Sequence, residues 1–258
     1  SQAAITGADL AIVATNADVR PAVVEQLLSA MDIKNLILEK VVFQTVELFD
    51  NALETFKRHN VNVWVNCSRR AWPFYKNLRT ELQREKEFRI EVSGSDWGMA
   101  CNAIHFVDLF AFLTGVDDIK ASGTSFDPVL KESKRKGFFE VTGSVTLENV
   151  KGEMVLRSAE EPGIERTVTI RVPGKKYIIN EQQGTCSLSF NTTTAVQETG
   201  FNFPFQSGLT GEIAEDILLN GKCNLTGIGE SYLHHKAILP LMMEHFYGLT
   251  GKKICPIT

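Results

Sequence analysis

The stretch NLILEKVVFQT, residues 35–45, decides the fold of this chain. A short apolar run, Leu36 to Leu38, stops at the charged pair Glu39 and Lys40 before further apolar residues follow. Lys and Glu are almost never fully buried unless they are paired, so the pair marks either a solvated strand end or a functional site. The segments on either side of this stretch decide between these two interpretations.

Those flanking segments repeat one pattern, in which a short apolar strand alternates with an amphipathic helix. We expect strands at residues 9–15, 35–40 and 61–66, and helices at residues 19–31 and 45–59. Alternating units of this kind imply a parallel sheet with crossover helices. Ligands of such sheets gather at the carboxyl ends of the strands, where Thr15, Asn16, Glu39, Lys40 and Asn66 fall.

The second half of the chain has a different pattern of expected helices and strands. A helix over residues 73–86 and an alternating strand over 87–94 precede a helix over 96–115 that ends at Gly115. Residues 117–206 then form consecutive strand-like segments without helices between them, which indicates an antiparallel sheet. Two helical stretches, 209–221 and 231–251, close the chain, and Pro240 is expected to kink the second.

These patterns predict an α/β domain followed by an α+β domain. We expect a partial Rossmann-type parallel sheet in residues 1–86, and a domain with a large, mainly antiparallel, open β-sheet in residues 87–258. A length of 258 residues is consistent with one large domain or two.

The composition is that of an ordinary soluble globular protein, with 43% hydrophobic and 22% charged residues. A formal net charge of -4 argues against nucleic acid or an anionic membrane as partner. No apolar run approaches the roughly 20 residues that a membrane-spanning helix needs. The five cysteines include no CxxC pair, so we expect no zinc site and no disulfide framework, and a cytoplasmic location.

The motif order then indicates a family. The segments DLAIVATNADVRP, LILEK, VNVWVNCSRRAWP and IHFVDLFAFLTG follow one another as in the Gfo/Idh/MocA (glucose-fructose oxidoreductase and inositol dehydrogenase) family, and the resemblance covers essentially the whole chain. It implies that Lys40 is the catalytic lysine and that Thr15, Asn16, Glu39 and Lys40 bind the nicotinamide end of the cofactor. Val41 stands where that family usually has proline.

The same resemblance places His105 at the family's active-site histidine. Helical spacing puts Cys101, Asn102 and Asp108 on its face of the helix. Cys101 occupies the position where many members carry aspartate, and we interpret it as a packing residue, while Asn102 is a candidate substrate contact.

The adjacent arginines Arg69 and Arg70 have two possible roles. They could clamp a phosphate or carboxylate of the substrate, or they could form a solvated basic turn. Both alternatives stay open at this stage. No metal-ligand spacing is visible in the sequence.

A dinucleotide-binding domain of this family starts with a strand, a GxGxxG turn and a helix, and the sequence shows no such turn before its first strand. We therefore expect NAD or NADP to be the cofactor of the full-length protein, and this chain alone not to bind it tightly.

Two functions remain. The first is an NAD(P)-dependent dehydrogenase, or a fragment of one, acting on a sugar, cyclitol or nucleotide sugar. The alternative is a non-catalytic sugar-binding or scaffold protein on the same fold that has lost dinucleotide binding. For either function, we expect a homodimer or tetramer formed through the β-sheet domain.

Overall fold

A computed structural model describes residues 6–202, 204 and 206–258 of the chain. The chain divides into two compact units, Ser1–Ser68 with Phe205–Thr258 and Arg69–Pro204. This division differs from the expected boundary after residue 86. Residues 69–86 fall in the second unit, and the C-terminal helices, which were expected in the second domain, fall in the first.

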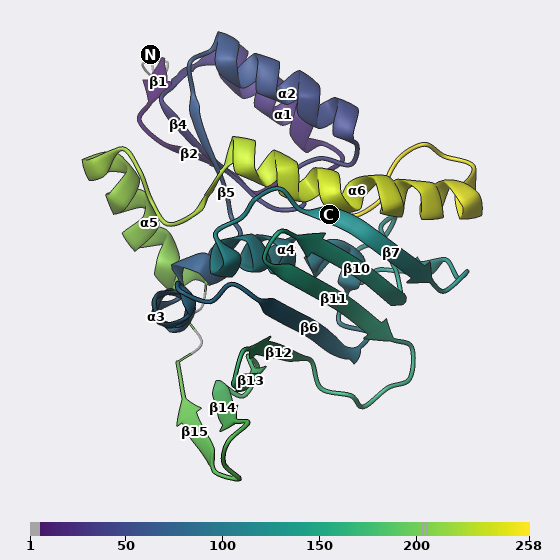
Figure 1. Cartoon of the computed structure of the whole chain (residues 1–258). Coiled ribbons are helices and arrows are strands. Elements are labelled where there is room, and N and C mark those ends of the chain that lie inside the picture. The colour runs from purple at the N-terminus through teal and green to yellow at the C-terminus, as the bar shows by residue number, and fades with distance from the viewer. Residues whose placement is uncertain (1–5, 203, 205) are drawn as a thin grey trace. The chain divides into compact units, whose positions relative to one another are not determined.

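The first unit consists of short parallel strands and long helices. Its elements are β1 (Gly7–Ala8), β2 (Ala11–Val13), α1 (Arg20–Ala30), β3 (Asp32–Ile33), β4 (Asn35–Leu38), α2 (Val46–Arg58), β5 (Asn62–Val65), α5 (Gln206–Asn220), β16 (Thr226–Gly227) and α6 (Ile228–Thr250). The main sheet has the strand order β16-β5-β4-β2, in which β2, β4 and β5 are parallel and β16 is antiparallel to β5. The expected parallel sheet with crossover helices is therefore confirmed (Figure 1).

Helix α2 shows why this part of the sequence folds as predicted. The Thr45 hydroxyl accepts a hydrogen bond from the Leu48 amide and caps the first turn. Glu47 in the first turn and Lys57 in the last turn complement the helix dipole. Phe49 is fully buried on the apolar face of the helix. Helix α2 packs on α1 and on α6, so its apolar face lies in the core of the first unit (Figure 1).

Helix α6 covers another part of this core. It packs on α2, β5 and β16, and its buried face is formed by Ile238, Leu239, Met242 and Phe246. The structure keeps one helix through Pro240 and ends it at Gly251, which has a left-handed backbone with φ 70°. The C-terminal helices therefore contribute to the parallel-sheet unit.

The second unit is dominated by strands. Its elements are α3 (Pro73–Leu82), β6 (Phe88–Ser95), α4 (Met99–Thr114), β7 (Lys120–Phe126), β8 (Lys131–Glu132), β9 (Phe139–Glu140), β10 (Gly143–Asn149), β11 (Gly152–Ala159), β12 (Thr167–Val172), β13 (Lys175–Asn180), β14 (Thr185–Phe190) and β15 (Val196–Gly200). A short 3-10 helix, η1 (Ser68–Ala71), precedes α3.

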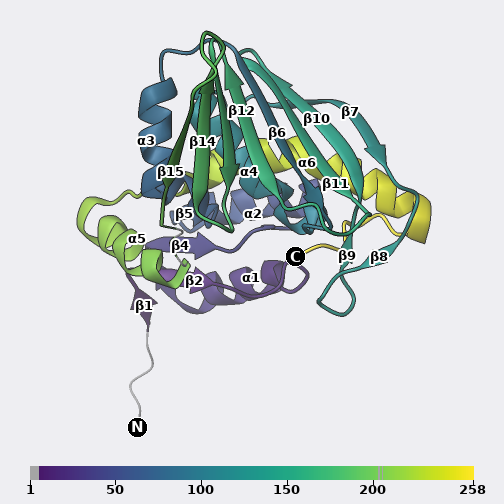
Figure 2. The ribbon, with the colours of Figure 1, turned by 90° about the horizontal axis from the view of Figure 1, so that it is seen from below.

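Eight of these strands form one sheet with the order β15-β14-β13-β12-β6-β11-β10-β7. Every neighbouring pair is antiparallel except β11 with β6, which is parallel. The expectation of a large, mainly antiparallel sheet is confirmed. Helix α4 packs on β6 and β11 and covers one face of the sheet (Figure 2).

The alternation of side chains along the strands explains the two faces of this sheet. In β6, Phe88, Ile90 and Val92 are buried, whereas Arg89 and Glu91 between them point to the other face. The buried residues meet α4, whose residues are almost all buried. Helix α4 ends at Gly115, with φ 68°, as the sequence predicted.

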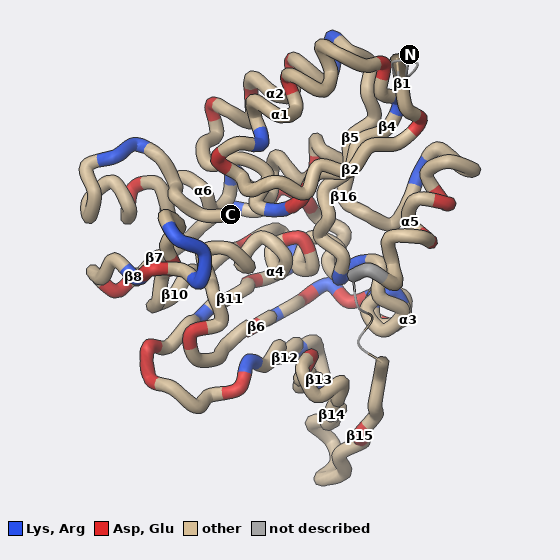
Figure 3. Tube along the Cα trace, turned by 180° about the vertical axis from the view of Figure 1, so that it is seen from behind, with Lys and Arg blue, Asp and Glu red and all other residues tan. Residues whose placement is uncertain are grey.

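Many charged residues of the second unit lie in its loops (Figure 3). The β8–β9 connection carries Lys134, Arg135 and Lys136, and the β11–β12 connection carries Glu160 and Glu161. Within the described part of the chain, no helix is long and apolar enough to cross a membrane.

Candidate functional site

Three strand ends of the first unit bring together most residues of the candidate cofactor site. The Glu39 amide donates to the Val13 carbonyl over 3.1 Å, and the Asn66 amide donates to the Leu38 carbonyl over 2.9 Å. The Asn66 side-chain amide in turn donates to Glu39 Oε1 over 2.7 Å. Glu39 and Asn66 are therefore joined at the carboxyl edge of the parallel sheet, where a ligand of such a sheet is expected.

Thr15 and Asn16 lie on the loop that follows β2 at the same edge. Asn16 is exposed and Thr15 is half-buried. The Thr15 hydroxyl oxygen itself is buried and has no hydrogen-bond partner among the described residues. A buried hydroxyl without a partner is costly, so a bound group that reached this oxygen would relieve that cost.

The segment after β4 turns sharply at Lys40, where the Lys40–Val41 peptide bond is cis. Lys40 is half-buried, and Val41, Val42 and Phe43 are completely buried. The buried guanidinium of Arg20 donates hydrogen bonds to the Val41 carbonyl and, over 2.8 Å, to the Val42 carbonyl. The main chain that carries Lys40 is therefore held by a side chain from the start of α1.

The last residues of the chain hold the same two loops. The Ala17 amide donates to the Thr258 hydroxyl over 2.8 Å, and the Gln44 side-chain amide donates to the Ile257 carbonyl over 3.1 Å. The Cys255 amide donates to the Gln44 carbonyl over 3.1 Å. Since Cys255 and Ile257 are fully buried, this tail is part of the first unit's core beside the candidate site.

The other predicted residues belong to the second unit. His105 is half-buried on α4, with Asn102 and Asp108 on its face of the helix, as the spacing predicted. The Asn102 side-chain amide donates to the Trp97 and Gly98 carbonyls over 3.2 and 3.0 Å. Asn102 thus stabilises the start of α4, and its candidate role in substrate binding stays a prediction.

The start of α4 is also bound by an acidic side chain that the sequence did not reveal. Glu140 Oε2 accepts hydrogen bonds from the amides of Ala100 and Cys101 over 2.9 and 3.4 Å. Glu140 is buried, and its negative charge lies at the positive end of the helix dipole. Cys101 is 7% exposed, in agreement with the interpretation of this residue as a packing residue.

The two arginines expected at the substrate are each bound to an internal carboxylate. Arg69 forms two hydrogen bonds with Glu181, over 2.7 and 2.6 Å. Arg70 pairs with Asp108 over 2.9 and 2.8 Å. The side chains of Arg69 and Arg70 are only 8% and 12% exposed, so the alternative of a solvated basic turn is wrong. A substrate clamp would require these ion pairs to break.

Glu181 is the centre of a buried cluster in the second unit. Besides Arg69, it accepts hydrogen bonds from Tyr75 over 2.8 Å and from Arg166 over 3.2 Å. Burial raises the pKa of Glu181, but the two guanidinium groups and the Tyr75 hydroxyl outweigh burial and hold that pKa below its ordinary value. Burial and the adjacent Glu181 charge raise the pKa of Tyr75 well above its ordinary range. The cluster therefore contains two cations and one anion.

Sequence reasoning missed Arg20, Glu140 and Glu181. Each acts on a residue that is distant in the sequence, and no local motif marks it. The one available signal was the position of Arg20 directly before Pro21 at the expected start of a helix. No group of three His, Cys, Asp or Glu side chains in the described ranges could hold a metal ion.

Comparisons with known proteins give matches only among solved structures. No family model and no curated protein matches the chain. A Gfo/Idh/MocA family oxidoreductase from Vibrio cholerae is 13% identical with a TM-score of 0.64, and the match covers 93% of this chain and 79% of that chain. The chain has the Gfo/Idh/MocA fold.

Two further structures share this fold. Biliverdin reductase from Synechocystis sp., in complex with biliverdin and NADP+, is 17% identical with a TM-score of 0.66, over 89% of this chain and 77% of that chain. A super-repressor mutant of Gal80p from Saccharomyces cerevisiae is 12% identical with a TM-score of 0.70, over 93% of this chain and 78% of that chain. The sequence-based identification of the Gfo/Idh/MocA fold is confirmed, and at these identities the likeness concerns the fold alone.

Proposed function

We propose that this chain belongs to an NAD(P)-dependent oxidoreductase that transfers hydride between nicotinamide and a secondary hydroxyl of a sugar, cyclitol or nucleotide sugar. The observation that carries the proposal is the pairing of Glu39 with Asn66 at the carboxyl edge of a parallel sheet, directly before Lys40 in the chain. The biliverdin reductase of the same fold, which is in complex with NADP+, supports the choice of cofactor.

The residues of this edge fit the nicotinamide end of such a cofactor. The buried Thr15 hydroxyl, which has no partner among the described residues, and the exposed Asn16 side chain can both bond to a ribose or an amide. Glu39 is oriented by its hydrogen bond from Asn66, and a carboxylate in this position can accept a hydrogen bond from a ribose hydroxyl. When bound, the nicotinamide accepts or donates the hydride.

The protein itself has to move one proton. A secondary alcohol loses its hydroxyl proton as hydride leaves the same carbon, so a base has to stand beside that hydroxyl. In the proposal Lys40 Nζ takes this proton. The family resemblance makes His105 a second candidate proton acceptor, and Asn102, one helical turn before it, a candidate for binding a substrate hydroxyl.

A second candidate is a sugar-binding or scaffold protein without catalysis. It is favoured by one observation, that a structure named as a super-repressor mutant shares the fold. The two candidates differ in whether Lys40 contributes to turnover.

The test is replacement of Lys40 in the natural protein that contains this chain. Lys40→Met should lower kcat by about 10² to 10⁴, the usual contribution of a positioned acid or base, and should change substrate affinity much less. Oxidation of a panel of sugars and cyclitols is followed by the absorbance of NADH and NADPH. Lys57→Met is the matched control, because Lys57 is exposed on α2 of the same unit. Equal turnover of the Lys40→Met and wild-type proteins would exclude Lys40 from the mechanism.

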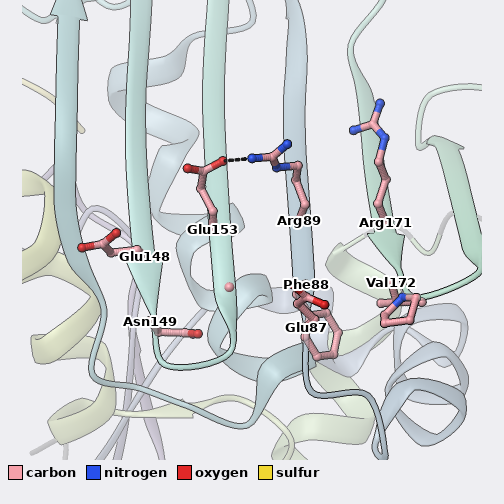
Figure 4. Close-up of a pocket in the computed structure, with 10 residues that line it drawn as sticks. Glu87, Phe88, Arg89, Glu148, Asn149, Glu153, Arg171 and Val172 are labelled. Atoms are coloured by element: carbon pink, nitrogen blue, oxygen red, sulfur yellow. Dashed lines mark ion pairs between the residues drawn. The ribbon is translucent and has the colours of Figure 1, made fainter.

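For the assembly, we propose a homodimer, or a tetramer that contains it, formed through the outer face of the eight-stranded sheet. A row of charges crosses this face from strand to strand, because each of its residues is the register partner of the next. The row consists of Glu148 on β10, Glu153 on β11, Arg89 on β6, Arg171 on β12 and Lys176 on β13. Figure 4 shows the first four of these side chains along a hollow of about 700 Å³. The two residues on β10 and β11 are acidic, and the three on β6, β12 and β13 are basic.

This row is self-complementary in one orientation of a symmetric dimer. A two-fold axis parallel to the strands, between β11 and β6, would place Glu153 of one copy opposite Arg89 of the other, and Glu148 opposite Arg171. An axis along the row would instead place like charges opposite each other, which is unfavourable. In the favoured orientation like charges meet only at the rim of the row, where Lys120 on β7 of one copy lies opposite Lys176 on β13 of the other.

Charge reversal tests this arrangement. Arg171→Glu and Glu148→Arg should each weaken the dimer, because each places two like charges opposite each other across the axis. The double variant restores opposite charges and should dimerise like the wild-type protein. Light scattering at micromolar concentration measures the mass. A monomeric wild-type protein, or a double variant that stays monomeric, would contradict the arrangement.

A further inference from the structure

One buried guanidinium connects the two loops that carry all four candidate cofactor residues. Arg20 is 1% exposed, and it donates to the carbonyl of Thr15 on the loop after β2. It also donates to the carbonyls of Val41 and Val42, which follow Lys40 directly. The backbone amide of Arg20 donates to the Asn16 carbonyl over 3.1 Å, so one residue bonds to both loops.

The chemistry of arginine suits this task. Its planar group presents several N–H donors in fixed directions, and hydrogen bonds from a charged donor are stronger than those between neutral groups. One nitrogen of Arg20 serves the adjacent carbonyls of Val41 and Val42, and the other serves Thr15. A lysine would offer a point charge on a flexible stem, and it could not hold three carbonyls from two loops in fixed positions.

A second side chain holds the same backbone from another direction. The Val42 amide donates to His235 Nε2 over 3.2 Å. His235 Nδ1 lies 2.7 Å from the Ser231 carbonyl, which fixes the ring with its proton on Nδ1 and leaves Nε2 as the acceptor. Both backbone polar groups of Val42 are therefore bound by side chains. This backbone is fully buried and lies two residues beyond Lys40.

We infer that Arg20 is a positioning residue for the reaction proposed above, and the inference rests on that proposed function. By fixing the carbonyls that follow Lys40 and the carbonyl that precedes Asn16, Arg20 keeps the proton acceptor and the nicotinamide-binding loop in one geometry. A small displacement of a catalytic group is costly, so this geometry controls turnover more than substrate binding.

Hydrogen exchange on the natural protein tests the positioning directly and without any activity. In the wild-type protein, the amide of Val42 should be protected as strongly as the sheet amides of β4. In Arg20→Lys, exchange over residues 13–19 and 39–44 should accelerate by about tenfold or more, while β5 and α2 change by less than about twofold. Arg20→Met should give the same pattern more strongly. The matched control Arg58→Met removes an exposed arginine of the same unit and should leave both loops unchanged.

Activity separates positioning from stability. Arg20→Lys should lower kcat by about 10²-fold with KM changed by less than about threefold. Uniform acceleration of exchange across the first unit, unchanged exchange in both loops, or local acceleration with normal kcat would each overturn the inference. If Arg20→Met fails to fold, the exchange pattern and the kcat of Arg20→Lys still decide the question. If the wild-type protein shows no turnover, the proposed function fails, and the exchange experiment still measures whether Arg20 fixes the loops.

Discussion

Replacement of Glu181 by glutamine should destabilise the second unit strongly, because the Glu181 carboxylate is the only anion in the cluster with Arg69, Arg166 and Tyr75. Its side chain is 1% exposed and accepts four hydrogen bonds from those three residues. Glutamine has nearly the same shape and keeps one acceptor oxygen, but it removes the negative charge. Two guanidinium groups are then left in a buried site without a counter-charge.

Removing one partner of a buried ion pair costs about 3–5 kcal/mol, since the remaining charge stays desolvated. The retained amide oxygen still accepts from Tyr75 or from one arginine, which places Glu181→Gln near the lower end, at about 3 kcal/mol. For a unit of this size, 1 kcal/mol corresponds to about 3 °C in Tm, so Tm should fall by about 10 °C. The second unit contains Trp72 and Trp97, whose fluorescence follows its unfolding in urea.

Two further variants make the measurement specific. Asp118→Asn removes an exposed partner of Lys120 in the same unit and should leave Tm unchanged. Combining Glu181→Gln with Arg166→Met should recover part of the lost stability, because only one guanidinium then lacks a counter-charge. A loss below about 1 kcal/mol for Glu181→Gln, or no recovery in the double variant, would refute the account of the cluster as a charge-compensated core.

Two further predictions concern the same unit. The raised pKa of Tyr75 means that the folded state holds the phenolic proton more tightly than the unfolded state does. Tyr75 therefore contributes stability that is fully present below about pH 10, the ordinary pKa of tyrosine. This stability is lost as the pH rises towards the pKa of Tyr75 in the folded state. Tyr75→Phe should therefore be less stable than wild type at pH 8, and urea unfolding at pH 11 should show a smaller difference; a constant difference would contradict this. At Gly152, with φ 154°, an added Cβ would lie 1.9 Å from the Phe88 carbonyl oxygen, so Gly152→Ala should cost more than about 3 kcal/mol. The control is Gly163→Ala, because an added Cβ at Gly163 would meet no neighbouring atom within 4 Å. Thermal unfolding compares the Tm of the two variants, and equal values would disprove the steric argument.

The sequence predicted those parts of the fold that depend on interactions between residues close together in the chain. The apolar run at Leu36 to Leu38, the capped face of α2 and the left-handed Gly115 each depend on neighbours within a few residues. The partners of the buried charges depend on contacts that the sequence does not display. The carboxylate that binds Arg69 belongs to Glu181, 112 residues later in the sequence. The carbonyls that bind Arg20 lie on two separate loops.

The division of the structure differs from the boundary expected after residue 86 for a related reason. The sequence pattern predicts a helix over residues 231–251, but not which of two apolar surfaces this helix covers. The structure pairs it with α2 and β5, so the chain returns to its first unit at the end. The roles of Lys40 and His105 stay predictions that rest on the resemblance of a motif order, which carries information from many related chains that one sequence alone lacks.

The single parallel pair in the eight-stranded sheet has a consequence for how the second unit folds. Strands β7, β10 and β11 can form a local meander, and β12 to β15 can form another, since each pairs with a neighbour close in the sequence. Strand β6 precedes both meanders, and it alone joins them, with Ile90 opposite Met154 on one side and Ile170 on the other. Its insertion closes long loops before it gains contacts, so this step should limit the folding rate. Substitutions that weaken the β6 contacts should therefore slow folding, whereas those in the outer hairpins should mainly accelerate unfolding.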